Sequence, residues 1–389
     1  MKRKISLLLL LVMTTSFTLV GCNSNSNKKA YVDSDVIKIG VFEPMTGANA
    51  AGGQLETEGA KLANKLYPTV LGKKVELVFA DNKSDKVEAA SAAANLIEQE
   101  HVNAIIGSYG SGFSMAAGDV VQEAKVPAVG VTCTNPLVTA GNDYYFRVCF
   151  IDPFQGTVMA KYAANKLNAK KVAILQEVSS DYSVGICKFF SDEFKKLTGD
   201  NNAVVAKANY NTGDQDFTAQ LTNIKSSNPD VIFAPGNFTE GAMLIKQARQ
   251  LGITTPIIGA DTWETPEFLD IGKDDVEGTV FSTFFATETP ITEESKIFLD
   301  AYRKEYNREP AAATALGYDA YILILDAIKR ADSADPVKIR DEIAKTKNFP
   351  GAAGVITIDE NNNAVKDAVL KVVKDGKFTY LDTIKADEN

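Results

Sequence analysis

VIKIGVF, at Val36–Phe42, is the first stretch of this 389-residue chain that predicts a buried β-strand. It is rich in β-branched residues and follows a polar segment, which is typical of a strand inside a parallel sheet. Downstream, strand patterns alternate with helical patterns. The further strands are KVELVFA (Lys74–Ala80), VNAIIG (Val102–Gly107) and Ala128–Val131, and the helices are Glu56–Leu66, Val87–Glu100 and Phe113–Ala124. The alternation predicts an α/β fold with a parallel sheet covered by helices.

The same order of patterns returns in the second half of the chain. KVAIL corresponds to IKIGVF, and the next three segments follow in the same sequence. The pairs are Lys171–Leu175 with the first strand, Val204–Tyr210 with Lys74–Ala80, Leu221–Asn237 with Leu96–Gly110, and Gly252–Asp261 with Lys125–Thr132. Few residues are identical, so order and spacing carry the correspondence. They predict two Rossmann-like lobes, with the first crossing of the chain near Ile151–Gly156.

The C-terminal part does not indicate a third domain. Its patterns are a strand at Thr279–Phe284, helices at Glu293–Tyr306, Ala311–Ala331 and Pro336–Lys345, and short strands at Gly354–Asp359 and Val369–Lys374. We expect these pieces to complete both lobes, so that the hinge has several segments. The predicted lobes are residues 36–151 with 286–365, and residues 152–285 with 366–385.

The N-terminus has the pattern of a lipoprotein signal peptide. Three cationic residues precede an apolar run from Ile5 to Val20, and the run ends in LVGC at Leu19–Cys22. We expect cleavage after residue 21, lipidation of Cys22 and a polar, flexible tether over residues 22–35. The alternatives are a secretory signal with an incidental cysteine and a transmembrane anchor, for which the run is short. A lipidated chain is held outside the cytoplasmic membrane.

Charge and composition exclude several classes of function. The signal peptide holds three of the 41 Lys and Arg residues and none of the 50 Asp and Glu, so the mature chain has 38 cations and a formal net charge of −12. Acidity of this size argues against a nucleic-acid partner and against electrostatic binding to membranes.

Reactive side chains are scarce. Apart from Cys22, the cysteines are Cys133, Cys149 and Cys187, an odd number without metal-site spacing, although one disulfide is open to them outside the cell. The single histidine, His101, stands where a helix is expected to end, which favours a surface or capping role over catalysis. No dinucleotide, phosphate-binding, nucleophile-elbow or calcium motif is present. The sequence therefore predicts neither an enzyme, nor a cofactor, nor a metal site.

Candidate ligand groups in the first lobe follow strands, because ligands of open α/β sheets bind beyond the carboxyl ends of strands. Ser111 follows one strand and stands at a predicted helix N-terminus, where its hydroxyl and nearby N–H groups suit a carboxylate. Thr132 and Thr134 follow the next strand, before Pro136. An ordinary N-cap serine and a polar connection bonded to itself are the structural alternatives.

The second lobe offers counterparts. Tyr182 lies in a Ser-rich loop after KVAIL, and Asp261 lies after the strand that corresponds to the one before Thr132. A carboxylate facing a helix N-terminus across a cleft suits a ligand with one cationic and one anionic end. Asp261 also fits a helix N-cap, and Trp263, the only tryptophan, fits a core or hinge position as well as a ligand pocket.

From Val36 to about Leu381 the chain resembles the branched-chain amino-acid-binding (Leu/Ile/Val-binding) family, the substrate-binding proteins of ABC transporters. The segments that carry the resemblance are IKIGVFEPMTG, AIIGSYGSG, VPAVGVTCTNP, YYFRVCFIDPFQG, LIKQARQLGI and IIGADTW. The resemblance implies the type I periplasmic-binding-protein fold and uptake of a ligand through a membrane permease. It agrees with the lipobox, because such proteins are often lipid-anchored.

The resemblance also implies roles for particular residues. Ser111 matches the serine that receives the ligand α-carboxylate, and Thr134 matches a threonine that contacts carboxylate and ammonium. Thr132 supplies backbone groups, and Tyr182 matches a tyrosine that closes over the ligand. Asp261 stands where the family has an acidic residue, commonly Glu, that pairs with the α-ammonium.

Two departures concern the pocket for the ligand side chain. Gly52 and Asn237 stand where leucine-binding members have aromatic residues, so we expect a larger, more polar pocket in which leucine, isoleucine and valine are not the tightest ligands. Tyr109, Asn237 and Trp263 are further candidates for this pocket, and Glu264 or Asn237 is expected to read the side chain.

The function expected from the sequence is capture of a free amino acid between two lobes, followed by delivery to the permease and ATPase of an ABC transporter. We expect a monomer that binds no nucleic acid. One alternative is a ligand without the α-amino group, such as a short amide or carboxylate. Another is a sensor lipoprotein that signals to a receptor kinase. A hydrolase is disfavoured because the sequence offers no convincing base.

Overall fold

The predicted first strand, β1 (Val36–Glu43), lies inside a six-stranded sheet in this computed structural model, which describes residues 34–386. Its strands run in the order β2-β3-β1-β4-β5-β6. The bounds are Thr69–Val70 for β2, Lys73–Asp81 for β3, Ala104–Ile106 for β4, Ala128–Gly130 for β5 and Tyr145–Arg147 for β6. All neighbours pair in parallel except β2, which pairs antiparallel with β3.

The second sheet repeats this order. Its parallel part runs β8-β7-β9-β10-β11, and the antiparallel strands β15 and β16 extend it beyond β11. The bounds are Val172–Glu177 (β7), Val204–Tyr210 (β8), Val231–Phe233 (β9), Ile257–Gly259 (β10), Val280–Thr283 (β11), Ala368–Lys374 (β15) and Lys377–Ile384 (β16). In both sheets the second parallel strand in sequence lies outside the first, and the later parallel strands follow on the other side. The predicted duplication is confirmed.

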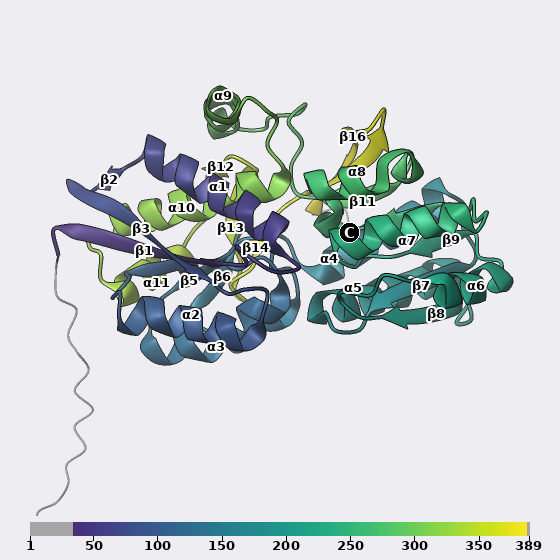
Figure 1. Cartoon of the computed structure of the whole chain (residues 1–389). Coiled ribbons are helices and arrows are strands. Elements are labelled where there is room, and N and C mark those ends of the chain that lie inside the picture. Colours follow the sequence, from purple (N-terminus) through teal and green to yellow (C-terminus); the bar gives the residue numbers. More distant parts are fainter. Residues whose placement is uncertain (1–33, 387–389) are drawn as a thin grey trace, which may run out of the picture. The chain divides into compact units, whose positions relative to one another are not determined.

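Helices cover both faces of the first sheet. In Figure 1, α1 (Ala50–Leu66) and α10 (Ala312–Ala331) lie on one face, and α2 (Lys86–Glu98) and α3 (Ser111–Ala124) on the other. Glycines let α1 and α10 approach closely: a Cβ at Gly59 would stand 2.0 Å from the Thr314 carbonyl oxygen, and one at Gly317 would stand 2.2 Å from the Glu56 carbonyl oxygen. The segment after β11 thus returns to the first sheet, as expected.

The remaining elements complete the two lobes. The α-helices are α4 (Asp152–Lys161), α5 (Asp181–Thr198), α6 (Thr218–Ser227), α7 (Phe238–Gln250), α8 (Pro266–Gly272), α9 (Glu293–Tyr306) and α11 (Pro336–Ala344). The short strands are β12 (Phe349–Gly351), β13 (Gly354–Ile358) and β14 (Ala364–Val365). The short helical turns are η1 (Pro136–Val138), η2 (Tyr162–Lys166), η3 (Asp261–Trp263) and η4 (Lys273–Val276).

The strands β12–β14 form a third, three-stranded sheet, which follows α10 on the first lobe. The chain therefore passes between the lobes three times: after β6, after β11 and after β14. The fold is therefore the expected one, two sheet-containing lobes joined by several segments. No helix or strand straddles the expected lobe boundaries, which themselves stay a prediction. The sequence patterns missed β6, which has three residues, and β16, whose side chains are partly or fully exposed and give no apolar run.

Three further expectations can be compared with residues 34–386. Cys133, Cys149 and Cys187 are buried free thiols, so the disulfide left open by the sequence is not formed. His101 is exposed, and its Nδ1 lies 3.3 Å from the Ile97 carbonyl oxygen near the end of α2, as expected of a capping residue. Within these residues there is no cluster of metal-binding side chains and no helix suited to spanning a membrane. Cys22, the signal peptide and most of the tether lie outside the described residues.

Candidate functional site

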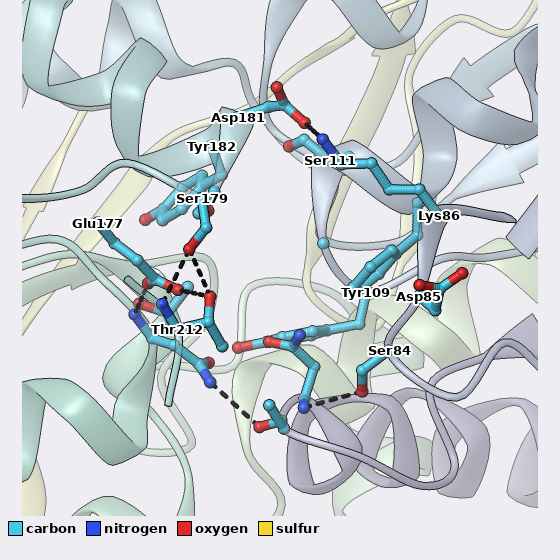
Figure 2. A pocket seen from close by; sticks show the side chains of 18 of the residues that line it. Ser84, Asp85, Lys86, Tyr109, Ser111, Glu177, Ser179, Asp181, Tyr182 and Thr212 are labelled. Carbon is cyan, nitrogen blue, oxygen red and sulfur yellow. Dashed lines mark hydrogen bonds and ion pairs between the residues drawn. The ribbon is translucent and has the colours of Figure 1, made fainter. Parts of the chain in front are cut away.

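A cavity of about 300 Å³ lies at the carboxyl ends of the parallel strands of both lobes. Figure 2 shows its walls: the starts of α2 and α3 on one side, and the loops after β7 and β8 on the other. The first lobe contributes Ala48, Asn49, Ser84–Lys86, Tyr109–Phe113 and Thr132, and the second contributes Glu177, Ser179–Tyr182, Thr212, Asn237 and Thr262. A smaller cavity of about 10 Å³ shares Tyr109 and Thr132 and reaches Gly52 and Asp261.

Ser111 is the first residue of α3 and lines the larger cavity. Its Oγ accepts a hydrogen bond from the Asn135 backbone N–H at 3.1 Å, which leaves the hydroxyl proton free to donate toward the cavity. The N-terminal turn of a helix also has backbone N–H groups without helical partners, and its dipole favours negative charge. This end of the cavity therefore suits a carboxylate.

The two threonines after β5 differ in position. Thr132 lines both cavities, and its hydroxyl donates a hydrogen bond to Glu56, so that its backbone groups are what it offers a ligand. Thr134 is fully buried and lines neither cavity. Its carbonyl oxygen accepts the Asp152 N–H at 2.9 Å, and its hydroxyl lies beside the Asp152 carboxyl group. Thr134 thus lies behind the cavity walls, and the ligand contact implied by the resemblance stays a prediction.

The acidic end is formed by Asp261 in η3. Its Oδ1 accepts hydrogen bonds from the Tyr182 hydroxyl at 2.7 Å and from Gln155 Nε2 at 2.6 Å. The side chain is 9% exposed and borders the smaller cavity, while Tyr182 lines the larger one. Burial raises the pKa of Asp261 to about 6, against the lowering effect of these two hydrogen bonds. A ligand ammonium group would stabilise the charged form that burial disfavours.

The pocket wall at Gly52 is not open as expected. The Tyr109 ring occupies the space beside this glycine, because a Cβ at Gly52 would stand 2.3 Å from the Tyr109 Cε2 atom. An aromatic residue from the loop after β4 therefore replaces the wall that position 52 lacks. The Tyr109 hydroxyl is buried and has no hydrogen-bond partner among residues 34–386.

The other two candidates for the side-chain pocket, Asn237 and Trp263, lie in different surroundings. Asn237 lines the larger cavity; its Nδ2 donates to the Ala48 carbonyl oxygen at 3.1 Å, and its buried Oδ1 has no partner within the described part of the chain. Trp263 lies in the second-lobe core, fully buried and stacked on Phe268 with ring centroids 4.9 Å apart. It lines neither cavity, so the core alternative is the correct one.

Glu264 is occupied by other partners. Its carboxyl oxygens bind Lys371 Nζ at 2.7 Å, the Thr283 hydroxyl at 2.5 Å and the Ala312 N–H at 3.0 Å. The side chain is 5% exposed and lies between the second lobe and the N-terminus of α10. Glu264 also borders the smaller cavity, and although these contacts engage its carboxyl oxygens, its part in reading a ligand side chain stays a prediction.

The lobes touch directly around the cavity. Lys86 Nζ pairs with Asp181 Oδ2 at 2.5 Å, as Figure 2 shows, and Asn135 Nδ2 donates to the Asp181 carbonyl oxygen at 2.9 Å. Together with the bond from Asn237 to Ala48, these contacts join the two walls. The described conformation is therefore a closed one.

Sequence reasoning missed several groups beneath the site. Gln155 supports Asp261, and Glu177 lines the larger cavity while its Oε2 accepts the Asn237 N–H at 2.9 Å. Glu43 and Glu56 are buried in the first lobe under Tyr109 and Thr132. One signal was present: β1 and β7 each end in a glutamate after an apolar run, at the strand end where ligands bind.

A sequence model described as "Periplasmic binding protein" matches residues 36–377, nearly the whole described region. The chain belongs to this family. Members of the periplasmic binding protein family are substrate-binding proteins. A curated relative, "Leu/Ile/Val-binding protein homolog 3" of Brucella melitensis, is 30% identical over 364 residues, which cover 91% of this chain and 95% of the relative.

Solved structures of similar proteins support the same family assignment. The leucine-binding protein LivK of Thermotoga maritima is 45% identical with a TM-score of 0.88, covering 91% of this chain and all of that one. A solute-binding protein of Rhodopseudomonas palustris, solved with 3,4-dihydroxybenzoic acid, is 26% identical with a TM-score of 0.80, covering 91% and 98%. The similarity to Leu/Ile/Val-binding proteins and the fold are thus confirmed, whereas the ligand differs among the similar proteins.

Proposed function

We propose that this binding protein captures a free amino acid between its lobes and presents it to an ABC transporter, while a lipid on Cys22 holds it at the outer face of the cytoplasmic membrane. The observation that carries the proposal is that hydrogen-bond donors and a carboxylate lie at different positions around the cavities. Ser111 at the start of α3 offers donors, and Asp261 offers a buried carboxylate. A zwitterion satisfies both.

The acidic end distinguishes an amino acid from a simple acid. Asp261 is nearly buried, and Tyr182 and Gln155 both bind the same oxygen of its carboxyl group. A ligand ammonium is the partner that makes this charged form favourable. In the proposed complex the α-carboxylate binds Ser111 and the backbone groups near Thr132, and Tyr182 covers the ligand.

Closure follows from the same contacts. A zwitterion that binds donors on one lobe and acceptors on the other makes all its bonds only when the lobes meet, so it stabilises the closed state by its differential affinity. The bonds from Lys86 to Asp181 and from Asn237 to Ala48 add direct contacts to that state. A permease that recognises the closed form would then accept the loaded protein.

The test is calorimetry of purified protein against the free amino acids. We expect at least one saturable ligand, and we expect its α-keto analogue to bind far more weakly, because Asp261 would stay buried without a cation. Equal affinity for the keto acid would contradict the zwitterion arrangement. For the anchor, labelled fatty acid should enter the parent protein in cells and not the Cys22→Ala variant.

A carboxylate without an amino group is the second candidate. The Rhodopseudomonas palustris protein similar to this chain was solved with an aromatic acid. Such a ligand needs the donors at Ser111 but not the charge of Asp261. Binding of 3,4-dihydroxybenzoate that is tighter than that of every amino acid, and unchanged in Asp261→Asn, would favour this candidate.

A further inference from the structure

Glu43 and Glu56 form a buried pair of acids in the first lobe. Glu43 is the last residue of β1, and Glu56 lies in α1; their side chains are 0% and 1% exposed. Burial raises the pKa values of both acids, and a contact between the two carboxyl groups opposes this rise for Glu43 and adds to it for Glu56. The two carboxyl groups therefore lie within hydrogen-bonding reach of each other.

The outer oxygens of the pair bind the walls of the ligand cavity. Glu43 Oε2 accepts the Tyr109 backbone N–H at 2.6 Å, and Glu56 Oε1 accepts the Thr132 hydroxyl proton. Tyr109 and Thr132 are the two residues that line both cavities. The pair thus joins β1 and α1 to the loops after β4 and β5, on which the cavity depends.

The inner oxygens have no other donor. Glu43 Oε1 and Glu56 Oε2 are sealed from water and find no donor among the groups that residues 34–386 supply. Two carboxylates in contact, without water or a cation, would repel each other strongly. One proton held between these oxygens removes the repulsion and supplies the missing hydrogen bond.

The neighbouring titratable groups do not offer a cation to the pair. The Cys133 thiol raises the pKa of both acids, and the charge of Glu43 or Glu56 raises the pKa values of Tyr145 and Tyr109. Arg147, a buried cation whose charge acts against burial to lower the pKa values of Cys133 and Tyr145, donates to the carbonyl oxygens of Cys133 and Asn135 and to the Thr139 hydroxyl. A shared proton is therefore the only neutralising charge in the immediate surroundings described.

We propose that Glu43 and Glu56 share one proton and act as positioning residues that hold Tyr109 and Thr132 in the shape that binds the ligand. Neither acid lines a cavity, so neither touches the ligand itself. Loss of the proton leaves two adjacent carboxylates, which separates α1 from β1 and moves the two wall residues. Ligand affinity then falls in alkaline solution because the protein loses this proton, and not because the ligand titrates.

The direction of the pH effect follows from the pKa shifts. Burial raises the pKa of Glu43 to about 8, and burial together with the Glu43 charge raises that of Glu56. The folded chain therefore keeps a proton that the unfolded chain has already lost, over the range between the ordinary value of a glutamate and the raised one. Stability falls as the pH rises across this range, and the binding shape is lost above it.

The test compares the parent with Glu56→Gln across this pH range. A glutamine amide donates permanently to Glu43, while its oxygen still accepts from Thr132, so the variant copies the protonated pair. We expect the parent to lose up to about tenfold in affinity per pH unit above the pKa of the pair, because each complex requires one proton. We expect the variant to bind at neutral pH and to lose this dependence. The ratio of the two affinities cancels titration of the ligand.

Three further variants make the result specific. Glu43→Gln should also flatten the profile, and it replaces Glu56→Gln if that variant does not fold. Cys133→Ser removes the other titrating group and should keep the alkaline fall. Glu240→Gln removes a buried acid of the second lobe, whose Oε1 accepts the Gly213 N–H at 2.7 Å, and should behave like the parent. The same fall in Glu56→Gln as in the parent, or its loss in Cys133→Ser, overturns the proposal.

The affinity experiment rests on the proposed function, so a second readout needs no ligand. Thermal unfolding of the ligand-free parent should become easier as the pH rises, relative to Glu56→Gln under the same conditions. If no amino acid binds but this difference appears, the proposed function fails and the shared proton stands. If amino acids bind but the parent and Glu56→Gln show the same pH dependence of unfolding and of affinity, the shared-proton proposal is wrong and the proposed function stands.

Discussion

β1 and β7 occupy the same place in the two sheets, and both end in a glutamate that accepts the backbone N–H of the loop after the next inner strand. Glu43 binds the Tyr109 N–H at 2.6 Å, and Glu177 binds the Asn237 N–H at 2.9 Å. The serine hydroxyls beneath these segments do not repeat in position, because α3 follows the inner strand β4 whereas α5 follows β7 itself. Ser114 Oγ accepts the Ser108 N–H, and Ser183 Oγ accepts the Glu177 N–H, both at 3.1 Å.

The two glutamates differ in what faces them. Glu43 meets a second carboxyl group, that of Glu56, and is closed off from the cavities. Glu177 lines the larger cavity, and its other oxygen accepts the Thr212 hydroxyl proton. The same strand-end glutamate is therefore closed off from the cavities in the first lobe and forms part of the cavity wall in the second.

The same division runs through the rest of the site. The first lobe presents donors at Ser111 and the start of α3. Its buried acids, Glu43 and Glu56, lie beneath the cavity surface, and its one acid among the walls, Asp85, caps α2. The second lobe presents acceptors, Asp261 and Glu177, at the surface. We infer that closure sets donors against acceptors and thereby orients a zwitterion. The predictions below test this division, starting with the largest expected effect.

Removal of the second-lobe charge should have the largest effect. Asp261→Ala should weaken binding of the best amino acid by about 2–5 kcal/mol, because a desolvated, charge-assisted contact to the ammonium is lost. Calorimetry of the parent and variant measures the difference. Glu240→Gln removes a buried acid of the second lobe that lines neither cavity and serves as the matched control. An unchanged affinity in Asp261→Ala would place the cation site elsewhere.

Acid should weaken binding through the same residue. Burial raises the pKa of Asp261 to about 6, and the ammonium requires the ionised carboxylate. Affinity should therefore rise as the pH rises through about 6 and fall below it, by up to about tenfold per pH unit. Titrations of the parent and of Asp261→Asn measure the profile. A variant that retains the acid limb would assign it to another group.

Loss of a first-lobe donor should cost less than loss of Asp261. Ser111→Ala should weaken binding by about 1–2 kcal/mol, because the backbone N–H groups at the start of α3 still bind the carboxylate. The bond from Asn135 to Ser111 is lost as well, so unfolding should be measured beside affinity. A larger effect than that of Asp261→Ala would reverse the ranking of the two lobes.

The unpartnered Tyr109 hydroxyl distinguishes polar from apolar ligands. Tyr109→Phe keeps the ring that fills the space beside Gly52. We expect it to lower the affinity for a small polar amino acid by about 0.5–1.5 kcal/mol, the worth of one hydrogen bond, and to leave leucine unaffected. Competition among amino acids measures both. Leucine displacing every other amino acid from the parent would show that the Tyr109 wall restores an apolar pocket.

The ion pair between the lobes should have the smallest effect. Lys86 and Asp181 have side chains that are 52% and 38% exposed, and such pairs contribute about 0–1 kcal/mol. Lys86→Ala should weaken binding within that range at low salt and not at high salt, because salt screens exposed charges. Lys83→Ala, which removes a pair within the first lobe, is the control.

Local sequence patterns were sufficient to predict the fold and the positions of the main polar loops. The period of apolar residues fixed the strands, and Val204–Tyr210 and Glu293–Tyr306 have the predicted bounds. The duplicated order gave two lobes, and the rule that ligands bind beyond strand ends selected Ser111, Thr132, Tyr182 and Asp261, all of which line one of the cavities. These features depend on local patterns, which are visible in a single chain.

The contacts that those loops make could not be predicted in this way, because they depend on long-range packing. Gly52 lies in α1 and Tyr109 follows β4, and nothing near either one shows that the ring fills the missing wall. Thr134 and Trp263 stand in loops of the expected kind, yet packing turns both side chains into the protein. The acid pair of Glu43 and Glu56 exists because a strand end and a helix meet. Burial and opposing charge belong to neighbours distant in sequence, and these set the chemistry of each group.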